Sequence, residues 1–177
     1  MNTPLNRKLI IAVFLIPAMM LGISATPVSA QELDARILIP TLGVDTSIVY
    51  APIVYPTWDV SHLGSRLGYL EGTAWFGQAG NTVLGGHATD AALNPDVLYT
   101  LDTLEQGAVI RVVVGAVELQ YAVAGVYRVA DTDVSLVVPT THEQLTILTC
   151  AVDSWNGVTF TERIIVVALP TVRIALN

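Results

Sequence analysis

Short runs of β-branched and other apolar residues, separated by Gly and Pro, recur along the chain after residue 35 and constrain its fold more than any other feature. The predicted strands are residues 36–49 with a break at Pro40 and Gly43, 81–86, 108–114, 118–127, 134–138, 145–150 and 164–169. Residues 108–114 and 118–127 together predict a hairpin that turns at Gly115. Seven or eight short strands are typical of a barrel or a sandwich, so we expect an all-β fold.

Helical patterns are sparse by comparison. Residues 59–63 and 96–104 each have the spacing of a short helical turn, so one or two short helices are expected on the surface of the barrel. Residues 51–78 contain Pro, Gly, Trp58 and Trp75 but few strand signals. We therefore expect this segment to be a long connection packed by its aromatic side chains.

The first 30 residues differ in composition from the rest of the chain. Arg7 and Lys8 precede an uncharged stretch over residues 9–30, and residues 28–30 (VSA) have the small side chains that a signal peptidase reads. This pattern predicts an export signal cleaved after residue 30. Because the uncharged stretch of 22 residues is long enough to cross a bilayer, a retained membrane anchor is the alternative. Both place residues 31–177 outside the cytoplasm, at the cell surface, anchored to the membrane or secreted.

Residues 31–177 have the length of a single domain, and their charge excludes one class of partner. They contain six Arg, no Lys and fifteen Asp plus Glu, which leaves a net charge of −9. A surface of this charge repels phosphate groups, so nucleic acid is not expected as a partner. The single cysteine excludes an internal disulfide, so the hydrophobic core alone must hold the domain together.

Cys150, the only cysteine, ends the strand predicted over residues 145–150. A lone cysteine is commonly an inert buried hydrophobe, but the end of a strand lies at the rim of a sheet, where loops and substrates meet. If residues 164–169 pair antiparallel with this strand, Arg163 faces Cys150. A guanidinium there can donate hydrogen bonds to a substrate carbonyl or to the oxyanion that develops on attack. The alternative is an ordinary surface ion pair between Arg163 and Glu162 or another acid.

A cysteine nucleophile needs a partner, since a free thiol with a pKa of about 8.5 is mostly protonated at neutral pH. His142 stands eight residues before Cys150, which corresponds to about 20 Å along an extended strand, so it is expected to be a solvated turn residue. His87 follows residues 81–86, and two glycines before it allow close backbone approach, so it is the better base. Its alternative role is a polar residue that opens a surface loop. His62, in a segment without a clear pattern, is a further alternative.

Taken together, these segments resemble the sortases, exported cysteine transpeptidases with an eight-stranded β-barrel and a His, Cys and Arg catalytic set in that chain order. Residues 36–45 (RILIPTLGVD) look like the first strand and turn of the family, and residues 80–87 (GNTVLGGH) are similar to its Gly-Asn-x-Val-(Ile/Leu)-(Ala/Ser)-Gly-His block. Residues 145–150 (LTILTC) resemble its Thr-Leu-x-Thr-Cys strand, and residues 163–168 (RIIVVA) resemble the strand that its arginine opens. The resemblance runs from residue 35 to about residue 169 and is nearest to the single-domain classes D, E and F.

The resemblance implies a sortase-like barrel with a catalytic domain over residues 31–177. The catalytic residues that it implies are His87, Cys150 and Arg163. It also implies that Thr149 and Gly86 bind substrate and that the loop over residues 130–144 lines the groove for the substrate. No acidic cluster matches the calcium site of some members, so no metal and no cofactor is expected.

The implied reaction is a transpeptidation through a thioacyl enzyme. Cys150 attacks the carbonyl after the Thr of a Leu-Pro-x-Thr-Gly-like sorting signal at the C-terminus of a secreted protein, while Arg163 steadies the oxyanion and His87 protonates the departing amine. An amine of a peptidoglycan precursor or a pilin then takes the acyl group; water in its place gives hydrolysis. The alternative function is a non-catalytic exported β-barrel that binds a wall polymer or protein and has a structural cysteine.

Overall fold

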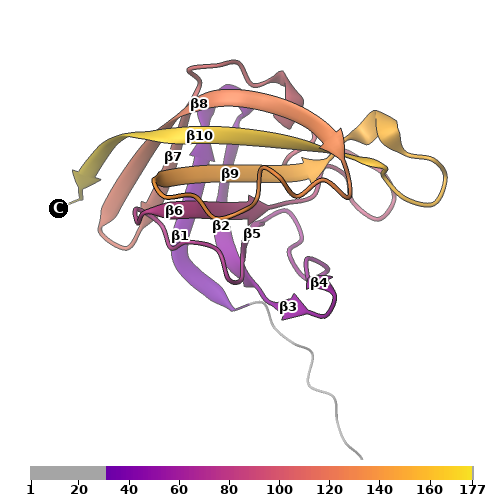
Figure 1. Ribbon diagram of the computed structural model, residues 1–177, viewed down its shortest axis with the longest axis horizontal. Helices are drawn as coiled ribbons and strands as arrows, with labels where there is room; N and C mark the ends of the chain where they lie inside the picture. Colours follow the sequence, from indigo (N-terminus) through magenta and orange to yellow (C-terminus); the bar gives the residue numbers. More distant parts are fainter. Residues whose placement is uncertain (1–30, 177) are drawn as a thin grey trace, which may run out of the picture.

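The computed structural model describes residues 31–176, which form a closed β-barrel of eight strands together with a small separate hairpin (Figure 1). The barrel strands are β1 (Glu32–Ile39), β2 (Val44–Ala51), β5 (Leu67–Leu70), β6 (Gly80–Gly85), β7 (Val109–Val114), β8 (Val117–Ala130), β9 (Glu143–Cys150) and β10 (Glu162–Ala175). Around the barrel the order is β1-β2-β5-β6-β9-β10-β8-β7, and β7 pairs with β1 to close it. The hairpin consists of β3 (Ile53–Val54) and β4 (Thr57–Trp58). The predicted all-β, eight-stranded barrel is confirmed.

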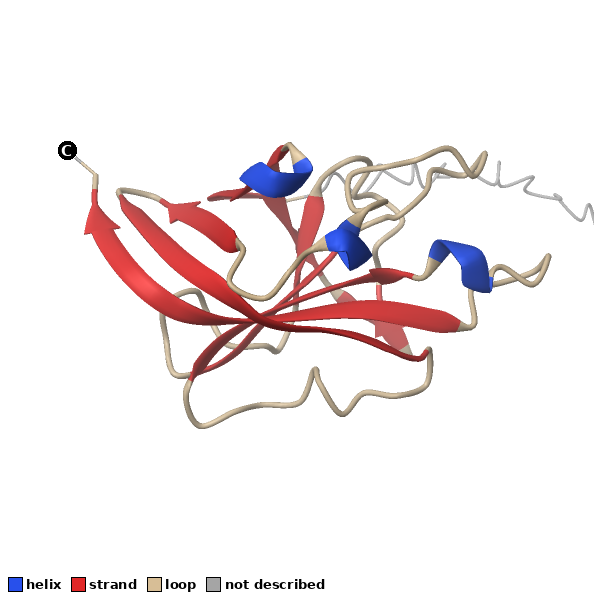
Figure 2. Cartoon of the chain, turned by 90° about the horizontal axis from the view of Figure 1, so that it is seen from above, coloured by secondary structure: helices blue, strands red, loops and turns tan. Residues whose placement is uncertain are grey.

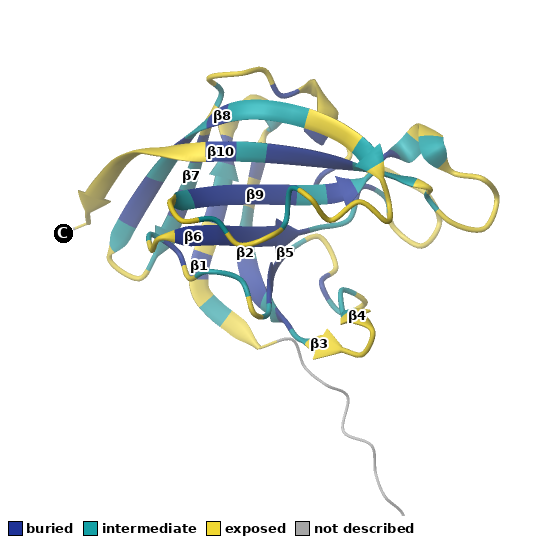
Figure 3. Cartoon of the chain, viewed as in Figure 1, coloured by how far each residue is buried: buried dark blue, intermediate teal, exposed yellow. Residues whose placement is uncertain are grey.

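Alternating side chains on the strands fill the barrel. Ile37 and Ile39 on β1 and Ile110 and Val112 on β7 are fully buried and meet in the interior. Full burial of such a side chain stabilises the fold by about 1.5–3 kcal/mol. Figure 3 shows the result: β6, β9 and the first half of β10 are buried, whereas the β3–β4 hairpin and the far half of β10 are exposed. The strands that carry the site therefore lie in the most buried part of the sheet.

Helix in the described part of the chain is limited to single 3-10 turns, drawn in blue in Figure 2. They are η1 (Pro40–Leu42), η2 (Leu101–Thr103) and η3 (Val152–Ser154). The predicted break between β1 and β2 is η1, and Gly43 ends it with φ 66° and an N–H that donates to the Pro40 carbonyl at 3.1 Å. The helical turn predicted over residues 59–63 is a hydrogen-bonded turn instead, and only η2 is helical in the segment 96–104. These segments are too short to complete an α-helical ladder.

Residues 1–30, where an export signal or a membrane anchor is predicted, lie outside the described residues. Within residues 31–176, no helix has the length and apolar character needed to cross a membrane. Export and anchoring therefore stay predictions.

Two predicted strand pairs, β7 with β8 and β9 with β10, are confirmed. β7 and β8 form the hairpin about Gly115, with Val114 opposite Val117. β9 and β10 are antiparallel neighbours, as expected. β10, however, continues past its predicted end at residue 169, because a shift in register between Pro170 and Val172 accommodates the proline.

The strand predicted over residues 134–138 is wrong, because side chains rather than a neighbouring strand satisfy this backbone. These residues form turns in the connection between β8 and β9. The Asn81 side-chain amide donates hydrogen bonds to the carbonyl oxygens of Leu136 and Val138, both at 3.1 Å. The Asp133 carboxylate accepts a bond from the Ser135 N–H at 2.8 Å. A β-branched composition favours extended backbone but does not supply a partner strand.

Strand β5 lies in the segment over residues 51–78 that was predicted to be one long connection. It pairs parallel with β2 and antiparallel with β6, so it completes the barrel. The strand has four residues, and Gly68 within it weakens the strand signal. A Cβ on Gly68 would lie 2.9 Å from the side chains of Ala51 and Leu63, so only glycine fits there. The expected aromatic packing is present, with Trp75 edge-on to Tyr69 at 5.2 Å between ring centroids.

Candidate active site

The ends of three adjacent strands bring the predicted catalytic residues to one edge of the barrel. β6 and β9 run parallel (Figure 1), and their register places Gly85 opposite Leu148. Two residues further along, this register sets His87, just past the end of β6, level with Cys150 at the end of β9. β10 runs antiparallel to β9 and places Arg163 directly opposite Cys150. The sheet therefore orders the three residues as His87, Cys150 and Arg163 across neighbouring strands.

All three residues line one pocket of about 200 Å³. Gly86 and Thr149, the predicted substrate-binding residues, line the same pocket. Its remaining lining is mostly apolar and comes from Thr57, Trp58, Val60, Leu70, Gly85 and Leu148. A thiol, an imidazole and a guanidinium that converge in a mostly apolar pocket have the composition of a nucleophilic site.

Hydrogen bonds between β6 and β9 hold the backbone in front of His87. The Gly86 N–H donates to the Leu148 carbonyl at 3.2 Å, and the Thr149 hydroxyl donates to the Gly86 carbonyl at 2.8 Å. A Cβ on Gly86 would lie 2.8 Å from the Leu98 side chain, so a larger residue here would displace Leu98. Both backbone polar groups of Gly86 thus bond to β9, the strand that ends in Cys150, and these bonds fix the spacing between β6 and β9.

The imidazole of His87 has a backbone partner that the sequence did not indicate. Its Nε2 lies 3.0 Å from the carbonyl oxygen of Val60, in the connection between β4 and β5. A carbonyl oxygen can only accept, so the neutral imidazole places its proton on Nε2 and leaves Nδ1 as the acceptor. Val60 carries no motif; only the aromatic character of the preceding residues marked this segment as packed.

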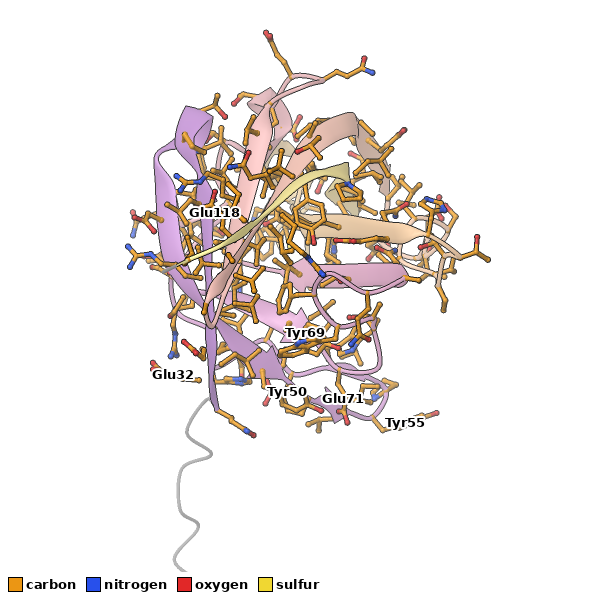
Figure 4. The ribbon with its side chains drawn as sticks, turned by 90° about the vertical axis from the view of Figure 1, so that its left-hand side faces the viewer. Glu32, Tyr50, Tyr55, Tyr69, Glu71 and Glu118 are labelled. Atoms are coloured by element: carbon orange, nitrogen blue, oxygen red, sulfur yellow. The ribbon has the colours of Figure 1, made fainter. Side chains whose placement is uncertain are left out.

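Glu71 attaches the β3–β4 hairpin, which precedes this connection, to the barrel. Its carboxylate accepts a bond from the Ile53 N–H at 2.6 Å, and its backbone carbonyl accepts one from Trp58 Nε1 at 2.9 Å. In Figure 4, Glu71 and Tyr50 lie side by side near the hairpin, while Tyr55 at its tip points away from the barrel and is 93% exposed. The wall of the pocket that holds Trp58 and Val60 is therefore attached at its base, even though the tip of the hairpin is free.

The thiol of Cys150 is half-buried, and burial raises its pKa above the ordinary value. The Arg163 guanidinium opposes that effect and lowers the thiol pKa, whereas the Asp131 carboxylate raises it further. The sum favours the neutral thiol, so a base or the approach of substrate must promote the thiolate.

The guanidinium of Arg163 is held by backbone groups rather than by an acid. Nη1 donates to the carbonyls of Phe160 at 2.8 Å and Glu162 at 3.0 Å. The Glu162 carboxylate pairs with Arg128 instead. The alternative of an ion pair between Arg163 and Glu162 is therefore wrong, and no carboxylate within residues 31–176 neutralises Arg163 in a salt bridge. Its charge stays available to the pocket.

The other two histidines lie outside this pocket. His142 directly precedes β9, at the end opposite Cys150, and its carbonyl accepts a bond from the Gly80 N–H at 3.1 Å. His62 is half-buried, with Nε2 3.1 Å from the Tyr50 carbonyl and Nδ1 3.6 Å from Asp59 Oδ2. Within residues 31–176, no three or more His, Cys, Asp or Glu side chains are grouped so as to hold a metal ion.

The loop over residues 130–144 lines a neighbouring pocket rather than the one around Cys150. Val137 and Thr140 are part of the lining of that second pocket, which has a volume of about 430 Å³. Trp58 lines both pockets, so they meet at its indole. Asn81 fixes the loop through the two bonds described above. Asn81 belongs to the GNTVLGGH segment, but its anchoring role was not predicted.

Comparisons with known proteins bear on the family and the fold. A family model described as a Sortase domain matches residues 37–171. The chain is similar to the structure of a sortase D5 transpeptidase from Clostridium perfringens, with 24% identity, 78% of each chain covered and a TM-score of 0.63. It is similar to sortase A from Corynebacterium diphtheriae, with 25% identity, 81% of this chain and 62% of that chain covered and a TM-score of 0.66. For sortase E from Streptomyces avermitilis the identity is 23%, the coverage 83% and 92%, and the TM-score 0.65. No curated protein sequence matches the chain.

Proposed function

Since the chain belongs to the sortase family of cysteine transpeptidases, we propose that it cleaves a Leu-Pro-x-Thr-Gly-like sorting signal and joins the cleaved protein to an amine. Sortases in general act on sorting-signal substrates and amine acceptors at the cell surface. The observation that carries the proposal is the single pocket shared by His87, Cys150 and Arg163 at the ends of three adjacent strands.

In the first half of the proposed reaction, Cys150 Sγ attacks the carbonyl carbon that follows the Thr of the sorting signal. The oxyanion that develops accepts hydrogen bonds from the guanidinium of Arg163. The His87 imidazolium gives its proton to the departing amine as the carbon–nitrogen bond breaks. The product is a thioester between Cys150 and the substrate. The uncompensated charge of Arg163 in a half-buried pocket supports its role, because preorganised donors stabilise charge best where water is excluded.

In the second half, an amine attacks the thioester carbonyl and His87, now neutral, takes its proton. The carbon–sulfur bond breaks, an amide forms, and the proton on His87 is ready for the next cycle or for the thiolate. Water in place of the amine gives hydrolysis by the same steps. The Val60 carbonyl supports this role of His87, because it holds the ring in one orientation while the other nitrogen stays free.

The two pockets that meet at Trp58 form the proposed groove for the sorting signal. Its residues next to the scissile bond would lie against Gly86, Thr149 and the apolar wall of the catalytic pocket. Residues further upstream would follow the second pocket past Val137. The apolar lining suits the Leu and Pro of the signal, since burial of such side chains supplies most of the affinity of small apolar sites.

The proposed partners are secreted proteins with a C-terminal sorting signal, and the proposed acceptors are amines of a peptidoglycan precursor or a pilin. A signal peptide or membrane anchor over residues 1–30 would bring the barrel to the same side of the membrane as both.

The alternative of a non-catalytic binding module requires an inert cysteine. Cys150 is half-buried and lines a pocket, so it is accessible in the folded protein. We expect a thiol reagent to label Cys150 in the native state at a rate that unfolding with denaturant increases only modestly. Labelling that requires unfolding would favour the structural role.

The proposed function is tested with a library of sorting-signal peptides, an added amine nucleophile and mass spectrometry. The expected products are the peptide cleaved after Thr and, with amine present, the corresponding amide. The Cys150→Ala variant should give neither product while its thermal unfolding temperature stays close to that of the unaltered protein. Product formation by Cys150→Ala would contradict the proposal.

A further inference from the structure

A further pocket of about 460 Å³ borders the catalytic pocket at His87. His87 lines both this pocket and the catalytic pocket, whereas Cys150 and Arg163 do not line this pocket. On one side the pocket is bounded by Trp155 and Phe160 from the connection between β9 and β10, and on the other by Thr89 and Asp96. We call it the His87-side pocket.

The proton transfers of the proposed reaction require a space for an amine beside His87. The acyl part of the substrate stays on Cys150 after the first half-reaction, so it continues to fill the catalytic pocket. The departing amine and the incoming amine both exchange a proton with His87, so both must lie beside His87 and clear of the acyl group. The His87-side pocket is a space of this kind.

The lining of the His87-side pocket suits an alkylammonium group. Trp155, 40% exposed, and Phe160 lie with ring centroids 4.8 Å apart and present an aromatic surface. No Arg lines the pocket, and residues 31–177 contain no Lys, so no Arg or Lys side chain there repels a cation. An aromatic face attracts an ammonium group and packs against methylene groups.

Two carboxylates line the same pocket, and they differ in what they already bind. Asp90 is occupied, because it accepts bonds from Ala92 N–H at 2.8 Å and from the backbone and side chain of Asn94 at 2.9 and 3.0 Å. Asp96 is half-buried and accepts one bond, from the Val97 N–H at 2.7 Å through Oδ1. Its Oδ2 is therefore the acceptor that remains for a ligand.

We propose that the His87-side pocket is the binding site of the acceptor, and that it selects a primary amine on an aliphatic chain, bound as its ammonium form. This inference rests on the proposed function. The chain of the acceptor lies on Trp155 and Phe160, and Asp96 attracts the ammonium group toward His87. The amine gives one proton to neutral His87, its nitrogen attacks the thioester carbon, and the carbon–sulfur bond breaks to leave an amide and the Cys150 thiolate. A second proton, lost from the nitrogen as the amide forms, passes to solvent.

A different pocket, of about 440 Å³, provides the matched comparison. Cys150 lines it, and so do the carboxylates of Asp102 and Asp153, but His87 does not. Asp153 is paired with Arg128 at 2.9 Å, while Asp102 is exposed. An amine in that pocket would reach the thioester without a base, so Asp102→Asn removes the same charge near Cys150 without the proposed effect.

The test measures partition between hydrolysis and aminolysis of a sorting peptide by the full chain, with two nucleophiles. Cadaverine is an aliphatic cation at neutral pH, whereas hydroxylamine is mostly uncharged and has no alkyl chain. Asp96→Asn, which keeps Oδ1 for Val97, is expected to raise the KM for cadaverine about three- to fivefold, the range for a partly exposed ion pair. The effect should shrink as the salt concentration rises. Hydrolysis without amine, the KM for hydroxylamine and all values for Asp102→Asn should stay unchanged.

The outcomes separate this inference from the proposed function. Normal hydrolysis with an unchanged cadaverine KM in Asp96→Asn would overturn the acceptor pocket alone, as would an equal rise in Asp102→Asn or an equal rise for hydroxylamine. Absence of cleavage by the unaltered protein would overturn the proposed function itself. A second variant, Trp155→Ala, should also raise the KM for cadaverine and leave hydrolysis intact, and failure of that effect would remove the aromatic surface from the proposal.

Discussion

The two ends of strand β9 have opposite character, although one strand and the same neighbours build both. At its N-terminal end, the Tyr121 hydroxyl donates to the Glu143 carboxylate at 2.9 Å. The Gln144 amide donates to the Thr146 hydroxyl at 3.0 Å, which donates in turn to Asn81 at 2.7 Å. At this end the polar side chains therefore bond to one another.

At the C-terminal end of β9, the site side chains bond only to backbone carbonyls and not to one another. Cys150 lies opposite Arg163, whose charge has no carboxylate partner in the described part of the chain, and a pocket opens beside them. The comparison teaches that polarity alone does not mark a site in this barrel. A site lies where polar groups converge on a pocket with part of their bonding capacity unused.

Among variants that test the difference between the two ends of β9, Arg163→Gln is expected to have the largest effect, a loss of peptide cleavage. Loss of the guanidinium should lower kcat/KM for peptide cleavage by about 10²–10³, the range for one donor to a developing oxyanion. Arg128→Gln is the matched control, because its guanidinium binds Asp153 and Glu162 on the surface and should matter little. Peptide cleavage assays of both variants decide the point. Equal losses would show that charge near the site, rather than its position opposite Cys150, supports catalysis.

An intermediate effect, on stability, is expected at the closed end of β9 from Asn81→Ala. The substitution leaves the carbonyls of Leu136 and Val138 without their donor and removes the acceptor of the Thr146 hydroxyl. Thr146 is fully buried, and an unsatisfied buried hydroxyl costs about 1–3 kcal/mol, which urea denaturation should show as a lower free energy of unfolding. Asn94→Ala, in an exposed loop, should change it by less than about 0.5 kcal/mol. Equal stability of the two variants would contradict the closed character of this end.

The smallest effect is expected at the open end, on the thiol itself. Because the Asp131 carboxylate disfavours the thiolate, Asp131→Asn should lower the pKa of Cys150, whereas Arg163→Gln should raise it. The rate of alkylation by iodoacetamide as a function of pH measures this pKa: its midpoint should move to lower pH in the first variant and to higher pH in the second. Asp133→Asn, whose carboxylate binds Ser135, should leave it unchanged. Shifts in the same direction for both test variants would refute the electrostatic account.

The sequence indicated the strand ends of the site but not its walls. Cys150 and Arg163 stand at the ends of clear apolar runs, and the antiparallel pairing of those runs was enough to set them opposite each other. His87 followed from its place after a strand and two glycines. Val60 and Trp58 were not predicted to line the site, because they come from an irregular segment whose position depends on tertiary contacts with Glu71 and His87. Periodicity carries no information about such contacts.

The same limit explains the errors in the strand assignments. The segment over residues 134–138 has the composition of a strand, but the Asn81 side chain, more than fifty residues earlier, takes the place of a partner strand. β5 has weak composition because Gly68 must pack closely against Ala51 and Leu63. In both places a long-range contact overrides local propensity.

The central claim, that Cys150 carries the acyl group between substrate and acceptor, is tested most directly by intact-mass spectrometry. The protein is mixed with a Leu-Pro-x-Thr-Gly peptide at low amine concentration and quenched with acid. A mass increase equal to the peptide fragment ending in Thr is expected, located on the segment that contains Cys150 and lost when an amine is added. A cleaved peptide with no adduct at any time of quenching, or an adduct on another residue, would contradict the account.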